Sequence, residues 1–168
     1  MKIRPETPQD INVIEQITFA AFDRKPYSDG TEHLIVNGLR EAGALAVSLV
    51  AEMDGKVVGH VAFSVVTVNG EDKGWVGLGP ISVLPELQKQ GIGSKMIREG
   101  LSLMRVKGAR GCVLEGSPEY YQRFGFRSYS GLVYEGAPAP EYFMALPFHE
   151  EVPEGKVEFH KTFYVNVK

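Results

Sequence analysis

Residues 74–104 constrain the fold more than any other stretch of the chain. Two β-rich runs, residues 75–78 and 81–84, are separated by the pair Gly79-Pro80. Proline has no N–H to give to a strand ladder, so we expect strand pairing to loosen or a bulge to form at this pair. The pattern therefore predicts a strand that is interrupted near its end.

A glycine-rich loop, Gln-Lys-Gln-Gly-Ile-Gly at residues 88–93, follows that strand. Apolar residues then recur at helical spacing, as in Ile92, Met96 and Met104, which indicates a helix that begins at the loop. A helix N-terminus presents unpaired N–H groups and the positive end of the helix dipole, and glycines let a bulky anion approach the backbone. We therefore predict a phosphate site built from the backbone of residues 90–94.

Two common phosphate-binding motifs do not fit this loop. The dinucleotide fingerprint needs a third glycine where this chain has Met96. The phosphate loop of nucleoside triphosphatases needs a lysine and a serine or threonine directly after its second glycine, and the chain does not supply them. The remaining pattern is Gln-x-x-Gly-x-Gly behind an interrupted strand.

A second informative segment is Ser-Pro-Glu-Tyr-Tyr-Gln-Arg-Phe-Gly-Phe at residues 117–126. It predicts a short helix with Ser117 as its cap and Gly125 as its stop. Taken alone, Tyr121 in this segment is most simply a packed aromatic residue beside Phe124. One residue earlier, Tyr120 is expected to point about 100° away from it.

The two segments together, in this order and spacing, resemble the motifs of the GNAT superfamily of acetyl-CoA-dependent N-acetyltransferases. Pro138-x-Pro140 followed by residues 143–146 is similar to the tail of the YhbS-like subgroup. The resemblance covers nearly the whole chain, although only the two motif regions are specific. It implies an α/β (α+β) fold: a mixed, mostly antiparallel central sheet that is flanked by helices and splayed at the central strand.

The resemblance also implies a reaction and its residues. An acetyl group would pass from acetyl-CoA to a primary amine of a small molecule or peptide by direct attack, with Tyr121 as general acid. Segments 27–30 and 135–142 would wall the amine site. The central strand would pair with the pantetheine arm, and an N–H of that strand would meet the developing oxyanion. The implied coenzyme-binding residues are Ile81, Ser82, Val83, Gln88, Lys89, Gln90, Gly91, Ile92, Gly93 and Ser94.

The general base stays open at this point. The family often places a polar residue on the central strand, where this chain has Gly77 and Gly79. Each substitute also has an ordinary structural interpretation, as a solvated carboxylate, a strand histidine or a helix cap. The substitutes are Glu52, His60, Glu115 and Ser117.

Length, charge and composition limit which other kinds of protein the chain can be. The chain of 168 residues suits one domain, residues 1–168, and its net charge of −3 gives no basic field for nucleic acid. We expect no membrane span, no metal because the histidines lack ligand spacing, and a cytoplasmic location. Cys112 is the single cysteine and is expected in a buried strand. The oligomeric state stays open, although the resemblance implies that a late hydrophobic strand often pairs across a homodimer in this family.

Two other functions remain open from the sequence. A catalytically silent acyl-CoA-binding module would keep the phosphate loop without needing a base. A nucleotide-binding module of another fold would prefer NAD or ATP to coenzyme A.

The rest of the chain predicts a simple order of elements. A helix to about Phe22 and a helix over 31–40 precede a meander of strands over 45–53 and 56–68. The helix that starts at the glycine loop is expected to end near residue 107. A strand at 111–114 should then lie parallel to the central strand, because a strand–helix–strand crossover gives that pairing.

Overall fold

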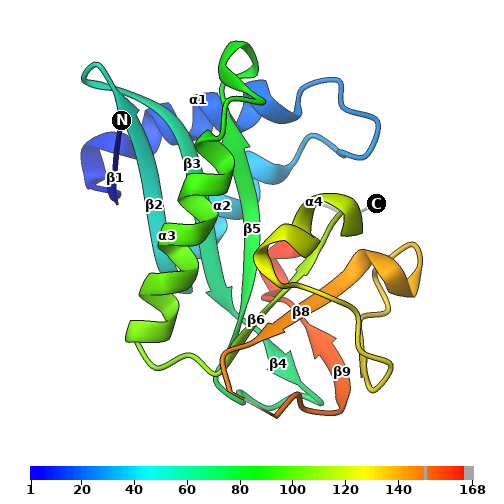
Figure 1. Cartoon of the computed structure of the whole chain (residues 1–168). Coiled ribbons are helices and arrows are strands. Elements are labelled where there is room, and N and C mark those ends of the chain that lie inside the picture. Colours follow the sequence, from blue (N-terminus) through cyan, green and yellow to red (C-terminus); the bar gives the residue numbers. More distant parts are fainter. Residues whose placement is uncertain (150, 165–168) are drawn as a thin grey trace.

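A six-stranded sheet forms the centre of the structure, a computed structural model that describes residues 1–149 and 151–164 (Figure 1). Its strand order is β1-β2-β3-β5-β6-β8, and only the β5–β6 pair is parallel. The predicted mixed, mostly antiparallel sheet is thus confirmed. The strands are β1 (Lys2–Pro5), β2 (Leu45–Met53), β3 (Lys56–Val65), β5 (Trp75–Val83), β6 (Gly111–Glu115) and β8 (Phe143–Pro147).

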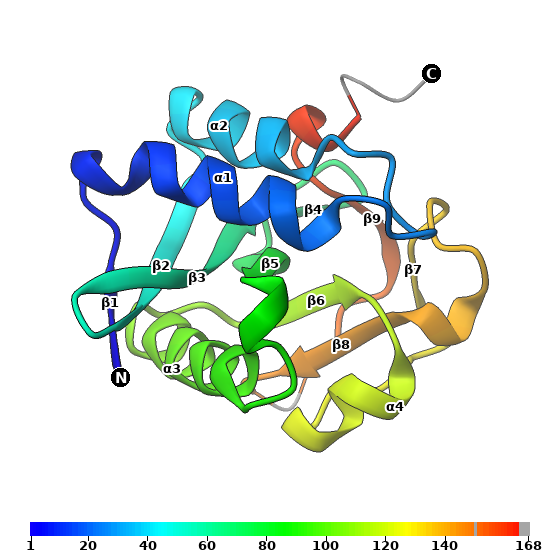
Figure 2. The ribbon, with the colours of Figure 1, turned by 90° about the horizontal axis from the view of Figure 1, so that it is seen from above.

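Helices cover both faces of this sheet (Figure 2). On one face lie α1 (Ile11–Phe22) and α2 (Glu32–Glu41), and on the other lie α3 (Ile92–Val106) and the short α4 (Pro118–Tyr121). None of the helices in the described part of the chain has the length and apolar character needed to cross a membrane. Short 3-10 turns occur at Pro8–Asp10, Pro85–Leu87, Gln122–Phe124, Pro140–Tyr142 and Lys161–Phe163.

A second, three-stranded sheet was not predicted. The strand expected over 56–68 is divided, because β3 ends at Val65 and β4 (Thr67–Val68) turns away from the main sheet. β4 pairs with β9 (Gly155–Glu158), which also pairs with β7 (Leu132–Val133). Burial explains the turn, since Val68 and Val157 pack in an apolar cluster of their own with Trp75.

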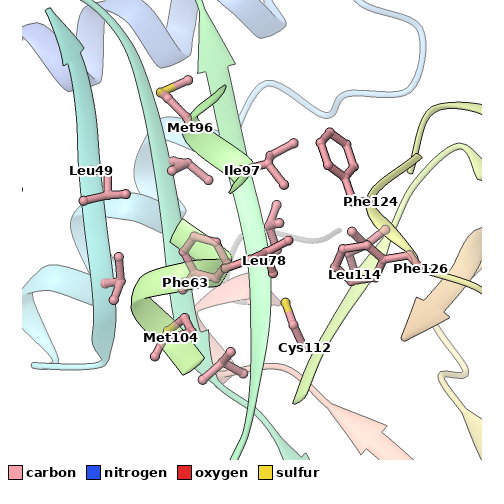
Figure 3. Packing of buried hydrophobic residues seen from close by; sticks show 14 of the residues in the cluster. Leu49, Phe63, Leu78, Met96, Ile97, Met104, Cys112, Leu114, Phe124 and Phe126 are labelled. Atoms are coloured by element: carbon pink, nitrogen blue, oxygen red, sulfur yellow. The ribbon is translucent and has the colours of Figure 1, made fainter. Parts of the chain in front are cut away.

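The main apolar core lies between the sheet and α3, as Figure 3 shows. Phe63 of β3 is fully buried there, in the same cluster as Met96 and Ile97 of α3. A Cβ atom on Gly100 would collide with the ring of Phe63, so this glycine lets α3 pack closely on the strand. Cys112 is also fully buried, as predicted.

We expect Phe63→Ala to lower the free energy of unfolding by about 3–5 kcal/mol, because it removes a buried ring and leaves a cavity. Val65→Ala on the same strand is the control, since Val65 is 42% exposed, and it should cost no more than about 0.5 kcal/mol. Urea unfolding monitored by circular dichroism measures both changes. Equal losses in the two variants would contradict this account of the core.

Candidate functional site

β5 and β6 pair over a short distance and then separate (Figure 1). Trp75–Gly77 are the β5 residues in the parallel ladder, and their partners run from Gly111 to Val113. On the other edge of β5, Leu78 lies opposite Phe63 and Ile81 opposite Val61, so β5 contains one extra residue between these pairs. The predicted bulge at Gly79-Pro80 is therefore present, and the sheet is splayed at the central strand as predicted.

Beyond the bulge, the backbone N–H and C=O groups of β5 point alternately toward β3 and toward the gap left by β6. The Leu84 N–H donates to the Val58 carbonyl at 3.0 Å, which places that N–H on the β3 side. Backbone groups of an antiparallel strand alternate in direction, so Ser82 also faces β3, whereas Ile81 and Val83 face the gap left by β6. The N–H groups of Ile81 and Val83 thus point to an edge with which no strand of the described residues pairs.

The glycine loop is held against the end of β5. The Gln88 side chain donates from Nε2 to the Val83 carbonyl at 3.0 Å. Gly91, the residue before α3, has φ of 88°, a conformation that L side chains rarely adopt, and a Cβ there would meet open space. A Cβ on Gly93 would lie 3.6 Å from the Tyr120 hydroxyl oxygen, an ordinary contact. The N-terminus of α3 is therefore exposed to the cleft.

One continuous cleft joins the gap between β5 and β6 to the α3 N-terminus. It consists of two cavities of about 680 and 690 Å³ that share Phe22, Tyr27, Ile81, Tyr120 and Tyr121, and we call it the main cleft. The second cavity brings together all the residues predicted to bind coenzyme except Gln90, which is exposed and does not line it.

Tyr121 lies on the wall of both cavities. Its ring packs so closely on Gly116 that a Cβ there would come within 2.5 Å of it. Burial, the main cause, raises the pKa of Tyr121 to about 12, so the phenol keeps its proton at neutral pH. No hydrogen-bond partner for its hydroxyl is found among the described residues, and the proton is available to a molecule in the cleft.

Tyr120, which was expected to point about 100° away from Tyr121, also lines the main cleft. Its ring meets the Tyr121 ring edge to face at a centroid distance of 4.9 Å. Its hydroxyl lies 3.2 Å from the Ser94 Oγ. The rotation between adjacent helical residues carries Tyr120 toward the start of α3 rather than into solvent, so both tyrosines line the main cleft.

Of the four candidate bases, two lie at the main cleft and two do not. Glu52 accepts a hydrogen bond from Arg4 at 3.3 Å and does not line the cleft. His60 is fully buried with its Nε2 2.8 Å from the Ser48 Oγ, and burial lowers its pKa. Glu52 is thus ion-paired rather than a solvated or capping carboxylate, whereas His60 is the buried strand residue that was its alternative.

Glu115 and Ser117 do lie at the main cleft. Burial raises the pKa of Glu115. Ser117 precedes α4, but its hydroxyl makes no capping hydrogen bond. Within residues 1–149 and 151–164, no group of three or more His, Cys, Asp and Glu side chains is placed to hold a metal ion.

The segments expected to wall the amine site are only partly in place. Tyr27, Pro138 and Tyr142 line the main cleft. Asp29 instead accepts a hydrogen bond from the Thr31 N–H at 3.1 Å, and Glu135 pairs with Lys156 at 2.9 Å. These carboxylates are engaged elsewhere.

Sequence reasoning missed several residues of the site, of which Phe22 and Gly116 are the most informative. Phe22 lines both cavities of the main cleft, yet in the sequence it was only the last apolar residue of a helix. Gly116 was also missed, although a glycine directly after a buried strand is a signal of close approach.

Comparison with known proteins gives concordant results. The family model described as "Acetyltransferase (GNAT) family" matches residues 11–126. The uncharacterized N-acetyltransferase YhbS of Escherichia coli K12 is 39% identical over 127 residues, which cover 75% of this chain and 73% of YhbS. The uncharacterized N-acetyltransferase YjhQ of the same strain is 34% identical over 133 residues, or 78% and 71% of the two chains.

Solved structures agree with these matches. A GNAT family acetyltransferase from Brucella melitensis in complex with acetyl-CoA is 51% identical with a TM-score of 0.87, covering 96% of this chain and 97% of that one. YhbS from Escherichia coli in complex with CoA is 33% identical with a TM-score of 0.89, covering 96% and 91%.

The two glycines of the loop should respond oppositely to alanine. Gly91→Ala should lower the free energy of unfolding by about 1–2 kcal/mol, the cost of a left-handed conformation for an L residue. Gly93→Ala lies in the first turn of α3, where alanine is favoured over glycine by up to about 1 kcal/mol, so it should be neutral or stabilising. Urea unfolding without ligand measures both, and a destabilised Gly93→Ala beside an unaffected Gly91→Ala would contradict the loop geometry.

Proposed function

The chain belongs to the acetyltransferase (GNAT) family and is an N-acetyltransferase, and from this premise we propose that it transfers an acetyl group from acetyl-CoA to a primary amine by direct attack. The observation that carries the proposal is the main cleft, which joins the exposed start of α3 to the unpaired edge of β5 and to Tyr121. Relatives in complex with acetyl-CoA and CoA support it. We propose that the reaction occurs in the cytoplasm.

The pyrophosphate of the coenzyme would bind at the start of α3. Backbone N–H groups from Gln90 to Ser94 are the donors, and the helix dipole favours an anion at this end. Gly91 places no side chain in the open space beside them. Lys89, in the same cavity, adds a positive charge nearby.

The pantetheine arm would lie along β5. Its amides resemble those of a peptide, and the outward backbone groups of Ile81 and Val83 can bond with an extended chain there. An arm that starts at α3 and follows this edge brings the thioester toward the bulge at Gly79-Pro80, close to Tyr121.

Residues of the chain then stabilise the two charges that develop during the reaction, one on the carbonyl oxygen and one on the departing sulfur. As the amine nitrogen attacks the carbonyl carbon, negative charge develops on the carbonyl oxygen, and the N–H of Ile81 can stabilise it. When the carbon–sulfur bond breaks, its electron pair stays on sulfur. Tyr121, which is still protonated at neutral pH, donates its proton to that thiolate.

Calorimetry with acetyl-CoA, together with thiol release across a panel of amines, tests the proposal. We expect tight acetyl-CoA binding, and thiol release only when an amine is present. Binding without thiol release for any amine would indicate a catalytically silent acyl-CoA-binding module. Stronger binding of NAD or ATP than of coenzyme A would overturn the proposal.

Gly91→Asp should weaken acetyl-CoA binding by about 30-fold, or about 2 kcal/mol, because it places a negative charge beside the pyrophosphate. Gly91→Asn is the matched control, since asparagine has nearly the same shape, tolerates positive φ and carries no charge. It should weaken binding several-fold less in calorimetry. Equal affinities for the two variants would show that no phosphate lies beside Gly91.

Tyr121→Phe should lower kcat by roughly 100-fold and leave the acetyl-CoA Kd nearly unchanged, because it removes a proton donor used only as the thiolate departs. Tyr120→Phe should instead weaken acetyl-CoA binding, since the Tyr120 hydroxyl lies beside Ser94 on the coenzyme side. Its effect is expected on the Kd, with kcat retained. Steady-state kinetics and calorimetry on both variants make the comparison, and the opposite assignment of effects would place the acid at Tyr120.

A further inference from the structure

A smaller cavity of about 200 Å³ opens beside β5 between α2 and the C-terminal segment. We call it the aromatic pocket. It shares Phe22, Leu78, Gly79, Pro80 and Glu115 with the main cleft, so the two cavities meet at the bulge of β5. Its remaining lining residues are Glu32, Ile35, Tyr134, Phe159 and Phe163.

β5 contributes no polar side chain where the two cavities meet. A Cβ on Gly77 would come within 2.6 Å of the Phe159 ring, so that ring fills the place of a side chain at position 77. Gly79 has φ of 137° and no atom within 4 Å of its missing Cβ, which leaves the junction open. A proton acceptor at this junction must therefore come from another element.

Glu115 is the titratable residue among those that line both cavities. It is the last residue of β6, beyond the point where β6 leaves β5. No hydrogen bond or ion pair of its carboxylate is found among the described residues. Partial desolvation at the cleft wall raises its pKa, although the residue keeps an exposed face toward the cavities.

The chemistry of the aromatic pocket favours a cation with an apolar body. Its ring walls pack on one another, with centroids 5.0 Å apart for Tyr134 and Phe159 and 5.2 Å apart for Phe159 and Phe163. Glu32 and Glu115 are the charged side chains of the lining, and both are carboxylates. Glu32 is held by the Ser28 hydroxyl at 2.7 Å and does not line the main cleft.

We propose that the acceptor is a small, cationic primary amine with a compact apolar body, bound in the aromatic pocket, and that Glu115 is the general base. This assignment rests on the proposed acetyl transfer. Glu32 contributes charge to binding, whereas Glu115 reaches the junction where the thioester would lie.

The proton and electron changes balance. The ammonium group gives one proton to the Glu115 carboxylate. The lone pair of the resulting neutral amine nitrogen then forms the carbon–nitrogen bond. The carbon–sulfur bond breaks, and the thiolate takes the proton of Tyr121. The attacking nitrogen loses its second proton to solvent, which reprotonates Tyr121, and Glu115 releases its proton to solvent.

The first test compares two acceptors with the intact protein. We expect kcat/KM for 2-phenylethylamine to exceed that for glutamate by at least about tenfold, because a carboxylate on the acceptor is repelled by the pocket. Acetyl-CoA binding with a preference for glutamate, or with no acetylation of 2-phenylethylamine, would overturn the pocket assignment alone. Failure to bind acetyl-CoA would overturn the proposed function as well.

The second test separates a base from a structural residue. Glu115→Gln should lower kcat with 2-phenylethylamine by about 100-fold, the usual contribution of general base catalysis. Phenylhydrazine, whose nitrogen is already neutral at the assay pH, should lose no more than a few-fold in the same variant. Equal losses with both acceptors, or no loss with either, would overturn the role of Glu115.

Two further carboxylate variants serve as comparisons. Glu119→Gln, an exposed residue of α4 that lines neither cavity, should leave both rates unchanged. Glu32→Gln should raise KM for 2-phenylethylamine several-fold and keep kcat. Thermal unfolding and the acetyl-CoA Kd confirm that each variant is folded. If Glu32→Gln loses kcat with 2-phenylethylamine but not with phenylhydrazine, then Glu32 rather than Glu115 is the general base.

Discussion

The short parallel ladder between β5 and β6 is the constraint on which the rest of the site depends. Beyond Gly77 the two strands separate, and β6 continues along β8 while β5 continues along β3. Close packing holds the paired part together, since a Cβ on Gly111 would collide with the Trp75 ring. The strands are thus joined at one end and open at the other, which gives the cleft two walls and leaves an edge of β5 without a strand partner.

The features that could be predicted from the sequence are those set by neighbouring residues. The bulge follows from Gly79-Pro80, and the start of α3 follows from Gly91 and the apolar spacing behind it. Each depends on backbone rules that act over a few residues. The phosphate loop around residues 90–94 was found for the same reason, whereas the pairing of the central strand with the coenzyme was implied only by the resemblance to the family.

The features that could not be predicted depend on contacts between distant segments. β4 and β7 have two residues each, too few to show a period, and they form only because β9 lies between them. His60 and Glu115 were equal candidates for the base in the sequence. Strand alternation could not separate them, because helices cover both faces of the sheet and only the fold shows which side chain reaches the cleft.

The ring of Phe159 beside Gly77 has a consequence for the order of assembly during synthesis. The glycine loop, α3 and the β5–β6 ladder lie within residues 75–115 and can form while the ribosome still holds the end of the chain. Phe159 and Phe163 emerge later, and until they dock, the central strand at Gly77 lacks the ring that covers it beside Val66. The order of synthesis thus allows the phosphate-binding half of the cleft to form before the aromatic half is enclosed.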